Sequence, residues 1–538
     1  MVDFSQIDNL LIKGQLDKVL ESIDKIEEEN KNLDQSSLKH WLTLYRYRVD
    51  IKQEKYLETI ENLEILLRKV REEKKDTILE LQINLSIIDI YQILNNVDVA
   101  FEKLQTIEPI INENSDDNNF IRVKAKFNEF FADYLFRIGD TERAIERATD
   151  AKSIYAQTGK ELNLAEVSNK LGAYYFQFGD HDASLSHFRA AFQIFVSNNM
   201  NYHQSVALGN IGTIYHVKGQ IKMALEYYEQ CYLIRKESGT PRQLINVLNN
   251  IGQAQMLRGK YNLAEKYFNE CLDICSSSNM IQERAVTLQN LGDLYRQKHN
   301  IKKAEDTYLQ CLSIFKEKKL VFRLAEILSA LVYLNVEENK LVKAKNYFQE
   351  LYELLGEKQE KLFKHLLLNS EAMILFSEDK REDSKEKFLQ VMQDDVAFYQ
   401  NNFFAGLKLI KIELSLSQQR EDLDTFFTNI DRIIEDLYLI AKNQKSPLLL
   451  FFVNLLKIKY YYILMRFDLI EHFLKEMREY LVEFDSQKFN DIVEKEEELY
   501  HILRQNYQNF AKGKDNKIKL IEESKIKETV EFLSSLIH

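Results

Sequence analysis

The feature that most constrains the fold of this chain is a pattern that recurs every 40 residues. Residues 247–268, VLNNIGQAQMLRGKYNLAEKYF, and residues 287–308, TLQNLGDLYRQKHNIKKAEDTY, agree in where they place Asn, Gly, Ala and a final aromatic residue. One position keeps this phase in seven copies, as Ala132, Gly172, Gly212, Gly252, Gly292, Val332 and Ala372. Because each copy would be one supersecondary unit, the pattern predicts a stacked array of repeats.

Each copy has the pattern of two helices joined by a turn. Seven residues after the small residue comes the predicted turn, at Gly139, Gly179, Gly219, Gly259, His299, Asn339 and Asp379. Apolar residues recur at three- and four-residue spacing on both sides of this turn, which is typical of amphipathic helices. We expect the small residues Gly212 and Ala224 to let the paired helices approach, with Tyr228 filling the space beside them. A single pair cannot bury its own apolar stripe, so neighbouring pairs must stack.

The phase continues beyond the regular copies. Turn and small positions can be followed backwards to Asn95 with Ala100, Glu54 with Thr59 and Gly14 with Val19. Residues 111–119, INENSDDNN, are read as a loop that stretches one spacing. Forwards, residues 466–481 and 488–511 have helical patterns, and KGKDNK at 512–517 is a break. The last segment places Ile526, Val530, Leu533 and Ile537 on one face, as a capping helix would.

These patterns divide the chain without indicating a separate globular domain. We expect divergent helix pairs over 1–120, the regular array over 121–395, further divergent pairs over 396–511 and a capping helix over 518–538. Only 3 prolines and 15 glycines occur among 538 residues, which favours long helices over β structure. About twelve helix pairs are therefore predicted.

Charge and composition narrow the classes of partner. The net charge of −12 disfavours nucleic acid and anionic lipid as partners. The N-terminus lacks the pattern of a signal peptide. The apolar stretch 448–465 would place Asn454, Lys457 and Lys459 inside hydrocarbon if it crossed a membrane, which is unfavourable. We therefore expect a soluble, cytoplasmic protein in which this stretch is a buried helix, without membrane insertion.

No motif points to catalysis. Cys231, Cys271 and Cys311 lie 40 residues apart, with Cys275 one turn beyond Cys271, and they occupy the small position of the repeat. Packing explains them better than a metal, because stacked units would hold the sulfurs too far apart. The ten histidines lack metal-binding spacing, and no phosphate loop or nucleophile elbow is present. The sequence predicts a protein that is not an enzyme and has no metal or cofactor, although a site assembled from distant helices stays open.

The best copy of the pattern resembles the tetratricopeptide repeat. It contains Leu288, Leu291-Gly292, Tyr295, Ala304, Tyr308 and Cys311. The usual repeat has ~34 residues, whereas this one has 40 and lacks the late proline. TLQNLGDLY and VLNNIGQAQ resemble the repeats of kinesin light chains and of Pins/LGN adaptors, clearly over about 125–390. The resemblance implies an all-α, right-handed α-solenoid of stacked antiparallel helix pairs, with first helices lining a concave groove.

Asparagine recurs at one position of the first helix in three consecutive copies, and this recurrence needs an explanation. Asn210, Asn250 and Asn290 precede the Gly in three consecutive copies, although Asn is a mediocre helix former. One reading is that the amides tie neighbouring first helices together; another is that duplication preserved them without a present function. The resemblance implies a third, in which the amides hold the backbone of a bound peptide. The candidate groove residues are Asn169, Asn210, Thr213, His216, Asn246, Asn249, Asn250, Gln253, Gln289, Asn290, Asp293, Arg296 and Gln297.

Three classes of function remain. The first is an interaction scaffold or adaptor that binds an extended segment of a partner protein in its concave groove. The second is a structural subunit that uses its convex face and rims in a larger assembly. The third is a peptide sensor, but similar bacterial arrays carry an extra output module, whereas residues 1–120 here continue the repeat. A homo-oligomer, and a C-terminal helix that occupies the groove, both stay open.

Overall fold

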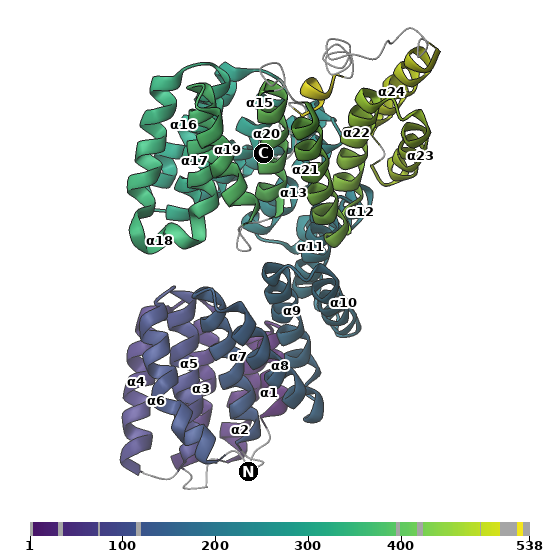
Figure 1. Ribbon diagram of the computed structural model, residues 1–538. Helices are drawn as coiled ribbons and strands as arrows, with labels where there is room; N and C mark the ends of the chain where they lie inside the picture. Colours follow the sequence, from purple (N-terminus) through teal and green to yellow (C-terminus); the bar gives the residue numbers. More distant parts are fainter. Residues whose placement is uncertain are drawn as a thin grey trace. The chain divides into compact units, whose positions relative to one another are not determined.

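The computed structural model describes residues 4–30, 36–73, 76–114, 120–393, 399–416, 423–484, 486–505 and 525–530. All regular secondary structure in these residues is helical, and consecutive helices pack against one another as pairs (Figure 1). The predicted all-α array of helix pairs is confirmed.

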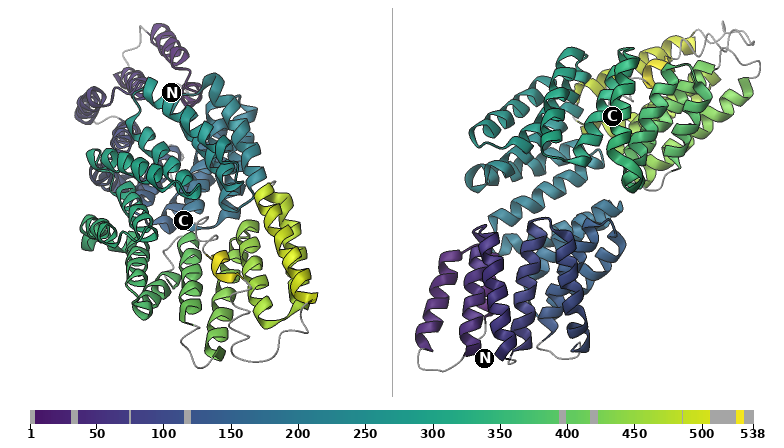
Figure 2. Two further views of the ribbon diagram at one scale, coloured as in Figure 1. Left: turned by 90° about the horizontal axis from the view of Figure 1, so that it is seen from above. Right: turned by 90° about the vertical axis from the view of Figure 1, so that its left-hand side faces the viewer.

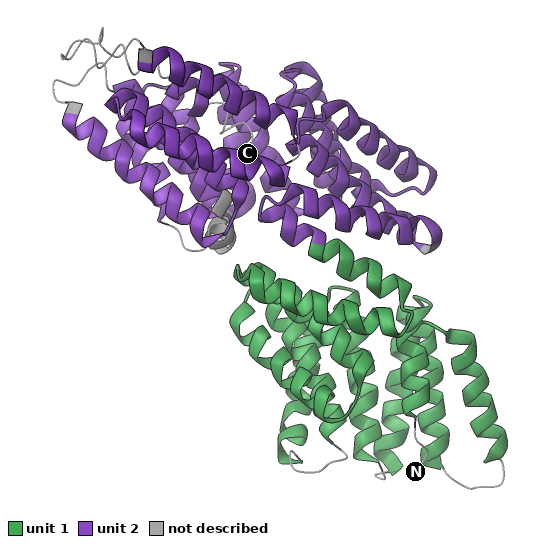
Figure 3. Ribbon diagram, turned by 90° about the vertical axis from the view of Figure 1, so that its right-hand side faces the viewer, with its two compact units in different colours: residues 1–211 green, residues 212–538 purple. Residues whose placement is uncertain are grey.

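The chain forms two compact units, residues 1–211 and 212–538 (Figure 3). Unit 1 contains α1 (Ser5–Ile12), α2 (Leu16–Glu29), α3 (Ser36–Lys52), α4 (Tyr56–Glu73), α5 (Thr77–Ile93), α6 (Val97–Glu113), α7 (Ile121–Arg137), α8 (Thr141–Gln157), α9 (Glu161–Phe178) and α10 (His181–Ser197). The boundary falls inside α11 (Asn201–Val217). It thus lies within the regular array, and the divisions predicted from repeat regularity stay a prediction.

Unit 2 contains the remaining helices. They are α12 (Ile221–Ser238), α13 (Pro241–Leu257), α14 (Tyr261–Ser277), α15 (Ile281–Gln297), α16 (Ile301–Glu317), α17 (Val321–Glu337), α18 (Leu341–Ser377), α19 (Arg381–Met392), α20 (Tyr399–Leu416), α21 (Leu423–Asn443), α22 (Pro447–Leu464), α23 (Phe467–Phe484) and α24 (Gln487–Gln505). Helix α18 runs through the place where two repeats would join and packs against both α17 and α19. No proline occurs between residues 351 and 370 to end it.

The predicted turns inside the pairs are confirmed by their backbone. Each predicted turn residue has a positive φ, at Gly14, Glu54, Asn95, Gly139, Gly179, Gly219, Gly259, His299, Asn339 and Asp379. A single left-handed residue ends the first helix and lets the chain reverse. Glycine adopts this conformation without strain, and Asn and Asp tolerate it better than most residues. The same turn therefore recurs in the divergent N-terminal copies as predicted, with slips in its spacing.

The small position allows the two helices of a pair to touch. A Cβ atom added to Gly252 would lie 2.4 Å from the Phe268 ring, and one added to Gly212 would lie 2.6 Å from the Tyr228 ring. Both aromatic rings are fully buried. Glycine is therefore needed there for close packing, as the sequence predicts.

Three predicted segments differ in part or lie outside the described residues. Residues 111–113, predicted as loop, complete the last turn of α6, whereas 115–119 are not described. The predicted helix over 488–511 is seen as α24 up to Gln505. Of the predicted cap over 518–538, residues 525–530 are described, and both Ile526 and Val530 are buried. Leu533, Ile537 and the break at 512–517 lie outside the described residues.

Helix α22 is the apolar stretch singled out in the sequence. It is the one helix in the described residues that is long and apolar enough to cross a membrane, and 72% of it is buried within the protein. Its lysines are paired: Lys457 Nζ lies 2.8 Å from a Glu435 carboxylate oxygen, and Lys459 Nζ lies 2.5 Å from Glu496. The predicted burial is confirmed, and the absence of membrane insertion stays a prediction.

Within unit 2, the last helix pairs contact the first. The Ser486 hydroxyl, just before α24, donates a 2.7 Å hydrogen bond to the carbonyl of Arg258, just after α13. Lys488 Nζ donates to the Tyr261 hydroxyl at 2.8 Å. Helix α23 also packs against α12, and the turn at Gly219 lies against Leu448. Figure 2 gives two further views of the helices. Unit 2 therefore closes on itself through the ends of its helices.

Candidate functional site

The candidate site is the face of first helices on which the predicted amides lie. In unit 2, Asn249 Nδ2 donates to Thr287 Oγ1 at 3.0 Å, and Asn290 Nδ2 donates to Asn249 Oδ1 at 2.9 Å. Gln253 Nε2 donates to Asn290 Oδ1 at 2.8 Å. Each bond joins α13 to α15, and Asn249 and Asn290 are buried. The structure thus brings three predicted residues together, and uses their amides to tie neighbouring first helices.

These contacts follow a fixed register along the array. Side chains 41 residues apart meet in the pairs Glu129–Lys170, Asn169–Asn210, Asn249–Asn290 and Ser329–Ser370. Side chains 37 residues apart meet in Asp133–Lys170, Gln253–Asn290 and Lys459–Glu496. The two separations differ by four residues, and residues four positions apart lie on one face of a helix. Both separations therefore describe contacts between the same faces of successive first helices.

The register also identifies the amides that lack a partner. The residue 41 positions before Asn250 in the sequence is Gly209, which has no side chain. No hydrogen bond of the Asn250 side chain is found in the described residues. Gln289 has Ala330 as its counterpart, and its Oε1 is unpaired, although its amide donates to Glu326. Gln297 Oε1 is unpaired as well. Asn250, Gln289 and Gln297 are each partly exposed.

Asp293 and Arg296 form a second cluster on α15. The Tyr308 hydroxyl donates to Asp293 Oδ1 at 2.6 Å. Burial raises the pKa of Asp293 to about 6, although the charge of Arg296 opposes the shift. Arg296 is itself buried. These two predicted groove residues are therefore occupied mainly with each other and with Tyr308.

The other predicted residues lie on α9, α11 and α13. In unit 2, Thr213 accepts a 3.4 Å hydrogen bond from Tyr228, and burial lowers the pKa of His216 to about 4, so this imidazole is neutral at pH 7. Asn246 is exposed one turn before Asn250. In unit 1, Asn210 donates to Asn169 at 3.4 Å.

A charged row on the corresponding face of unit 1 was missed by the sequence interpretation. Lys126 and Lys170 lie 3.1 and 2.7 Å from the buried carboxylate of Glu129, and Lys170 lies 2.6 Å from Asp133. Burial alone would raise the pKa of Glu129, but the two lysines hold it at about 2. Tyr155 also donates to Glu129 at 3.0 Å. The 41-residue spacing of Glu129 and Lys170 was the signal that could have found this row.

A family model for the tetratricopeptide repeat matches residues 161–237, 202–277 and 243–317. These matches contain α9 to α16, where the register of amide contacts is clearest. The chain contains tetratricopeptide repeats. No curated protein sequence matches it.

Several solved structures are similar to this chain. A Rap protein complexed with competence and sporulation factor is 15% identical, covers 65% of this chain and 95% of its own, and has a TM-score of 0.49. Aspartyl phosphate phosphatase F from Bacillus subtilis is 15% identical, with coverages of 66% and 94% and a TM-score of 0.45. Repeats of a putative kinesin light chain from Podosopora anserina are 16% identical, with coverages of 37% and 96% and a TM-score of 0.32. The absence of enzymatic activity in this chain stays a prediction.

The cysteines pack between the helices of the tetratricopeptide repeats. Cys231, Cys271, Cys275 and Cys311 are all buried free thiols. Burial raises the pKa of the Cys275 thiol to about 11 and that of Cys311 to about 12, so neither is a thiolate at pH 7. The predicted packing role is confirmed. In the part of the chain that the structure describes, no three His, Cys, Asp or Glu residues are grouped to hold a metal.

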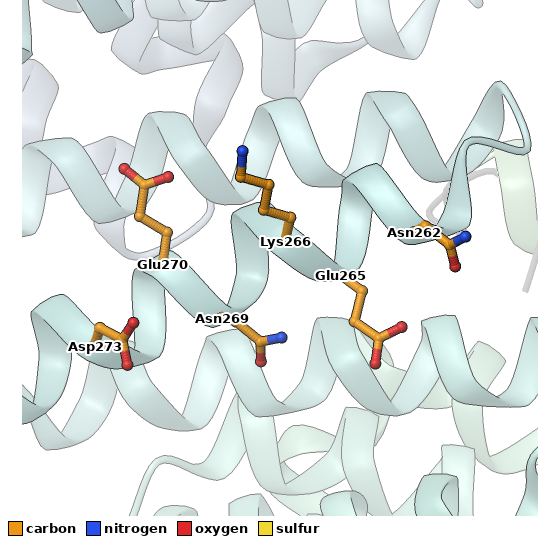
Figure 4. A pocket seen from close by; sticks show the side chains of 6 residues that line it. All are labelled: Asn262, Glu265, Lys266, Asn269, Glu270 and Asp273. Carbon is orange, nitrogen blue, oxygen red and sulfur yellow. The ribbon is translucent and has the colours of Figure 1, made fainter.

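Two surface hollows are products of the repeat itself. One, of 540 Å³, lies along α14 and is lined by Asn262, Glu265, Lys266, Asn269, Glu270 and Asp273 (Figure 4). The other, of 400 Å³, is lined by residues at the same six positions of α10, two repeats earlier, which are Asp182, Leu185, Ser186, Arg189, Ala190 and Gln193. The same hollow thus occurs on two second helices and is lined by different side chains on each. Its shape therefore does not indicate a specific ligand.

Proposed function

We propose that this protein is an interaction scaffold that binds an extended segment of a partner protein on the first-helix face of α13 and α15. One observation carries the proposal. On a face where several amides bond to one another, Gln289 and Gln297 each keep a buried amide oxygen without a partner, and Asn250 is partly exposed with no side-chain hydrogen bond in the described residues. Buried polar groups are nearly always hydrogen-bonded in proteins, so the oxygens of Gln289 and Gln297 can accept from a bound ligand.

The free groups suit a polypeptide backbone. A carboxamide has two donors and an acceptor, and can bond to a peptide N–H and C=O whatever the side chain. An unpaired buried acceptor is destabilising by about 1–3 kcal/mol, which a peptide N–H would relieve. The neighbouring face is mostly neutral, because Asp293 and Arg296 offset each other. An extended segment held by its backbone therefore fits better than a strongly charged ligand.

The bonded amides have a different role in this proposal. Asn249 and Asn290 hold α13 and α15 in register and so set the spacing of Asn250 and Gln289. They are positioning residues, whereas Asn250 and Gln289 contact the partner. Binding is the only activity that we assign, and we place it in the cytoplasm on the grounds of composition.

The test begins with selection of binding peptides. A library of random 12-residue peptides is selected on the full-length protein, and one selected peptide is labelled and titrated by fluorescence anisotropy. Removing one hydrogen bond to the ligand lowers affinity by about 1 kcal/mol, or about five-fold in Kd. We expect Asn250→Ala to weaken binding by this factor and to leave the melting temperature nearly unchanged.

Two controls separate contact from scaffolding. Asn249→Ala removes a buried tie between helices, so it should lower the melting temperature, which Asn250→Ala does not. Replacing one backbone amide of the peptide by an ester should weaken binding to the wild type and less so to Asn250→Ala. Selection of no peptide, or equal affinity for the wild type and for Asn250→Ala with Gln289→Ala, would contradict the proposal.

A further inference from the structure

The described part of the C-terminal segment, residues 525–530, lies on a first-helix face of unit 2. Ile526 and Val530 are both 0% exposed and belong to the same apolar cluster as residues of α20 to α24. The segment also lies close to Lys459 of α22, since Lys525 and Glu528 both act on that ammonium electrostatically. Figure 1 draws the segment in yellow.

The register shows which face of α22 this is. Lys459 on α22 bonds to Glu496 on α24, 37 residues later. Gln253 on α13 bonds to Asn290 on α15 with the same separation. Helix α22, followed by a left-handed Met465 and then α23, is the first helix of its pair, as α13 is of its own. The segment therefore lies beside the face that corresponds to the amide face of α13 and α15.

Within the described residues, one side of the segment is buried and the other is exposed. Ile526 and Val530 are one helical turn apart and point into the cluster, whereas Lys525, Lys527 and Glu528 are exposed. A short helix with two buried aliphatic side chains makes a small contact compared with α22 or α24, whose buried faces run over their whole length. Such a contact resembles an amphipathic helix that packs on a partner by its apolar side.

The surface beside the segment is not purely apolar. Lys459 and Glu496 form an ion pair whose lysine side chain is 3% exposed, and burial lowers the pKa of that lysine. A buried ion pair loses much of its attraction to desolvation, and regains hydration when it is uncovered. Lys525 and Glu528 of the segment act on this pair, so any hydration that the pair regains when the segment leaves would offset part of the cost of exposing apolar surface.

We propose that this face of α22 and α24 is an exchangeable helix-binding surface, occupied within the chain by residues 525–530. A partner that competes for it would be a short amphipathic helix with two aliphatic residues four positions apart. This inference is independent of the proposed peptide-binding face of α13 and α15, because the peptide that tests it is the chain's own C-terminal segment.

The test uses a fluorescein-labelled synthetic peptide of residues 518–538 and the full-length protein. In the variant Ile526→Ser with Val530→Ser, the segment no longer fills the surface, so the peptide should bind in trans. We expect it to bind the wild type at least ten-fold more weakly, because the attached segment competes at high effective concentration. Lys527→Ser alters an exposed residue of the same segment and should behave as the wild type.

Two outcomes would overturn the proposal. Failure of the peptide to bind the double variant would show that the empty surface does not take a helix, and equal binding to all three proteins would show that the segment does not compete there. Hydrogen exchange on the wild type gives an answer even if the variant misfolds. The hydrogen-bonded amide of Thr529 should exchange at least ten-fold faster than the amides in the middle of α22 and α24, and equal rates would identify a permanent cap.

Discussion

At the scale of single residues, the amides of this protein differ in role although they look alike in sequence. Asn250 and Asn290 occupy the same place in consecutive repeats, yet Asn290 bonds to both Asn249 and Gln253, whereas no hydrogen bond of the Asn250 side chain is found in the described residues. A residue's role therefore depends on the side chain 41 positions away, which a single copy of the repeat does not reveal.

Asp293 gives a prediction at the same scale. Its pKa of about 6 lies above the value of about 3.9 for an unfolded aspartate. Between these values the native state binds more protons, so stability decreases as pH rises from 4 to 6. In Asp293→Asn this contribution is absent. We expect the wild type to lose up to about 2 kcal/mol relative to the variant between pH 4 and pH 7.

Denaturant unfolding of both proteins at a series of pH values measures this difference. The charged and titratable groups around Asp293 are Arg296 on its own helix, Tyr308 on α16 and Glu326 on α17. Burial raises the pKa of Glu326 too, so Glu326→Gln is the matched control for a second titration. Parallel pH profiles for the wild type and Asp293→Asn would refute the assignment.

At the scale of the helix pair, close approach depends on complementary sizes at two positions. Gly252 faces Phe268, and a Cβ there would lie 2.4 Å from the ring. The corresponding positions of an earlier repeat hold Ala132 and Ala148, both buried. The pair can thus be built with a glycine and a large ring, or with two alanines.

This comparison predicts the result of exchanging the two residues. Gly252→Ala forces the ring to move and should be destabilising by about 1–3 kcal/mol. Phe268→Ala leaves a cavity and should be destabilising by about 3–5 kcal/mol. The double variant should be less destabilised than the sum by at least about 1 kcal/mol, because the new methyl group occupies part of the cavity.

Chemical unfolding of the four proteins completes this cycle. Asn246→Ala, at an exposed position of the same helix, should change stability by no more than about 0.5 kcal/mol. Additive effects at Gly252 and Phe268 would mean that the two positions do not share space.

At the scale of the whole molecule, each compact unit brings distant parts of the chain together. In unit 1, Lys160 Nζ donates to Ser5 Oγ at 2.7 Å, which joins α9 to α1. In unit 2, the contacts of Ser486 and Lys488 with the end of α13 span 228 and 227 residues. The N-terminus of α24 meets the C-terminus of α13, so opposite ends of two helix dipoles are in contact, which is favourable.

Breaking this junction should open unit 2 locally. Ser486→Ala with Lys488→Ala removes two donors worth about 1 kcal/mol each. Hydrogen exchange should become at least ten-fold faster around residues 256–262 and 486–490 and stay unchanged in α15 to α17. Lys495→Ala, at an exposed position of α24, is the control. Unchanged exchange at the junction would show that other contacts suffice to close unit 2.

The sequence by itself determined the all-helical array, the helix pairs and their phase. Residues such as Gly139, Asn339 and Asp379 mark turns because a left-handed residue is a local requirement, and Gly252 marks close packing because the aromatic residue follows at a constant distance. Both kinds of signal act within one pair of helices. They can be read wherever the repeat is recognisable, even in the divergent copies around Gly14 and Glu54.

Only the tertiary structure decided which amides are internal and which are free. The 41-residue contacts depend on how one pair stacks on the next, and the closing contact of Ser486 depends on how successive stacking angles accumulate over unit 2. The residues of a single repeat do not determine these stacking angles. The burial of Ile526 and Val530 was decided in the same way, because the face that receives them exists only after α20 to α24 have assembled.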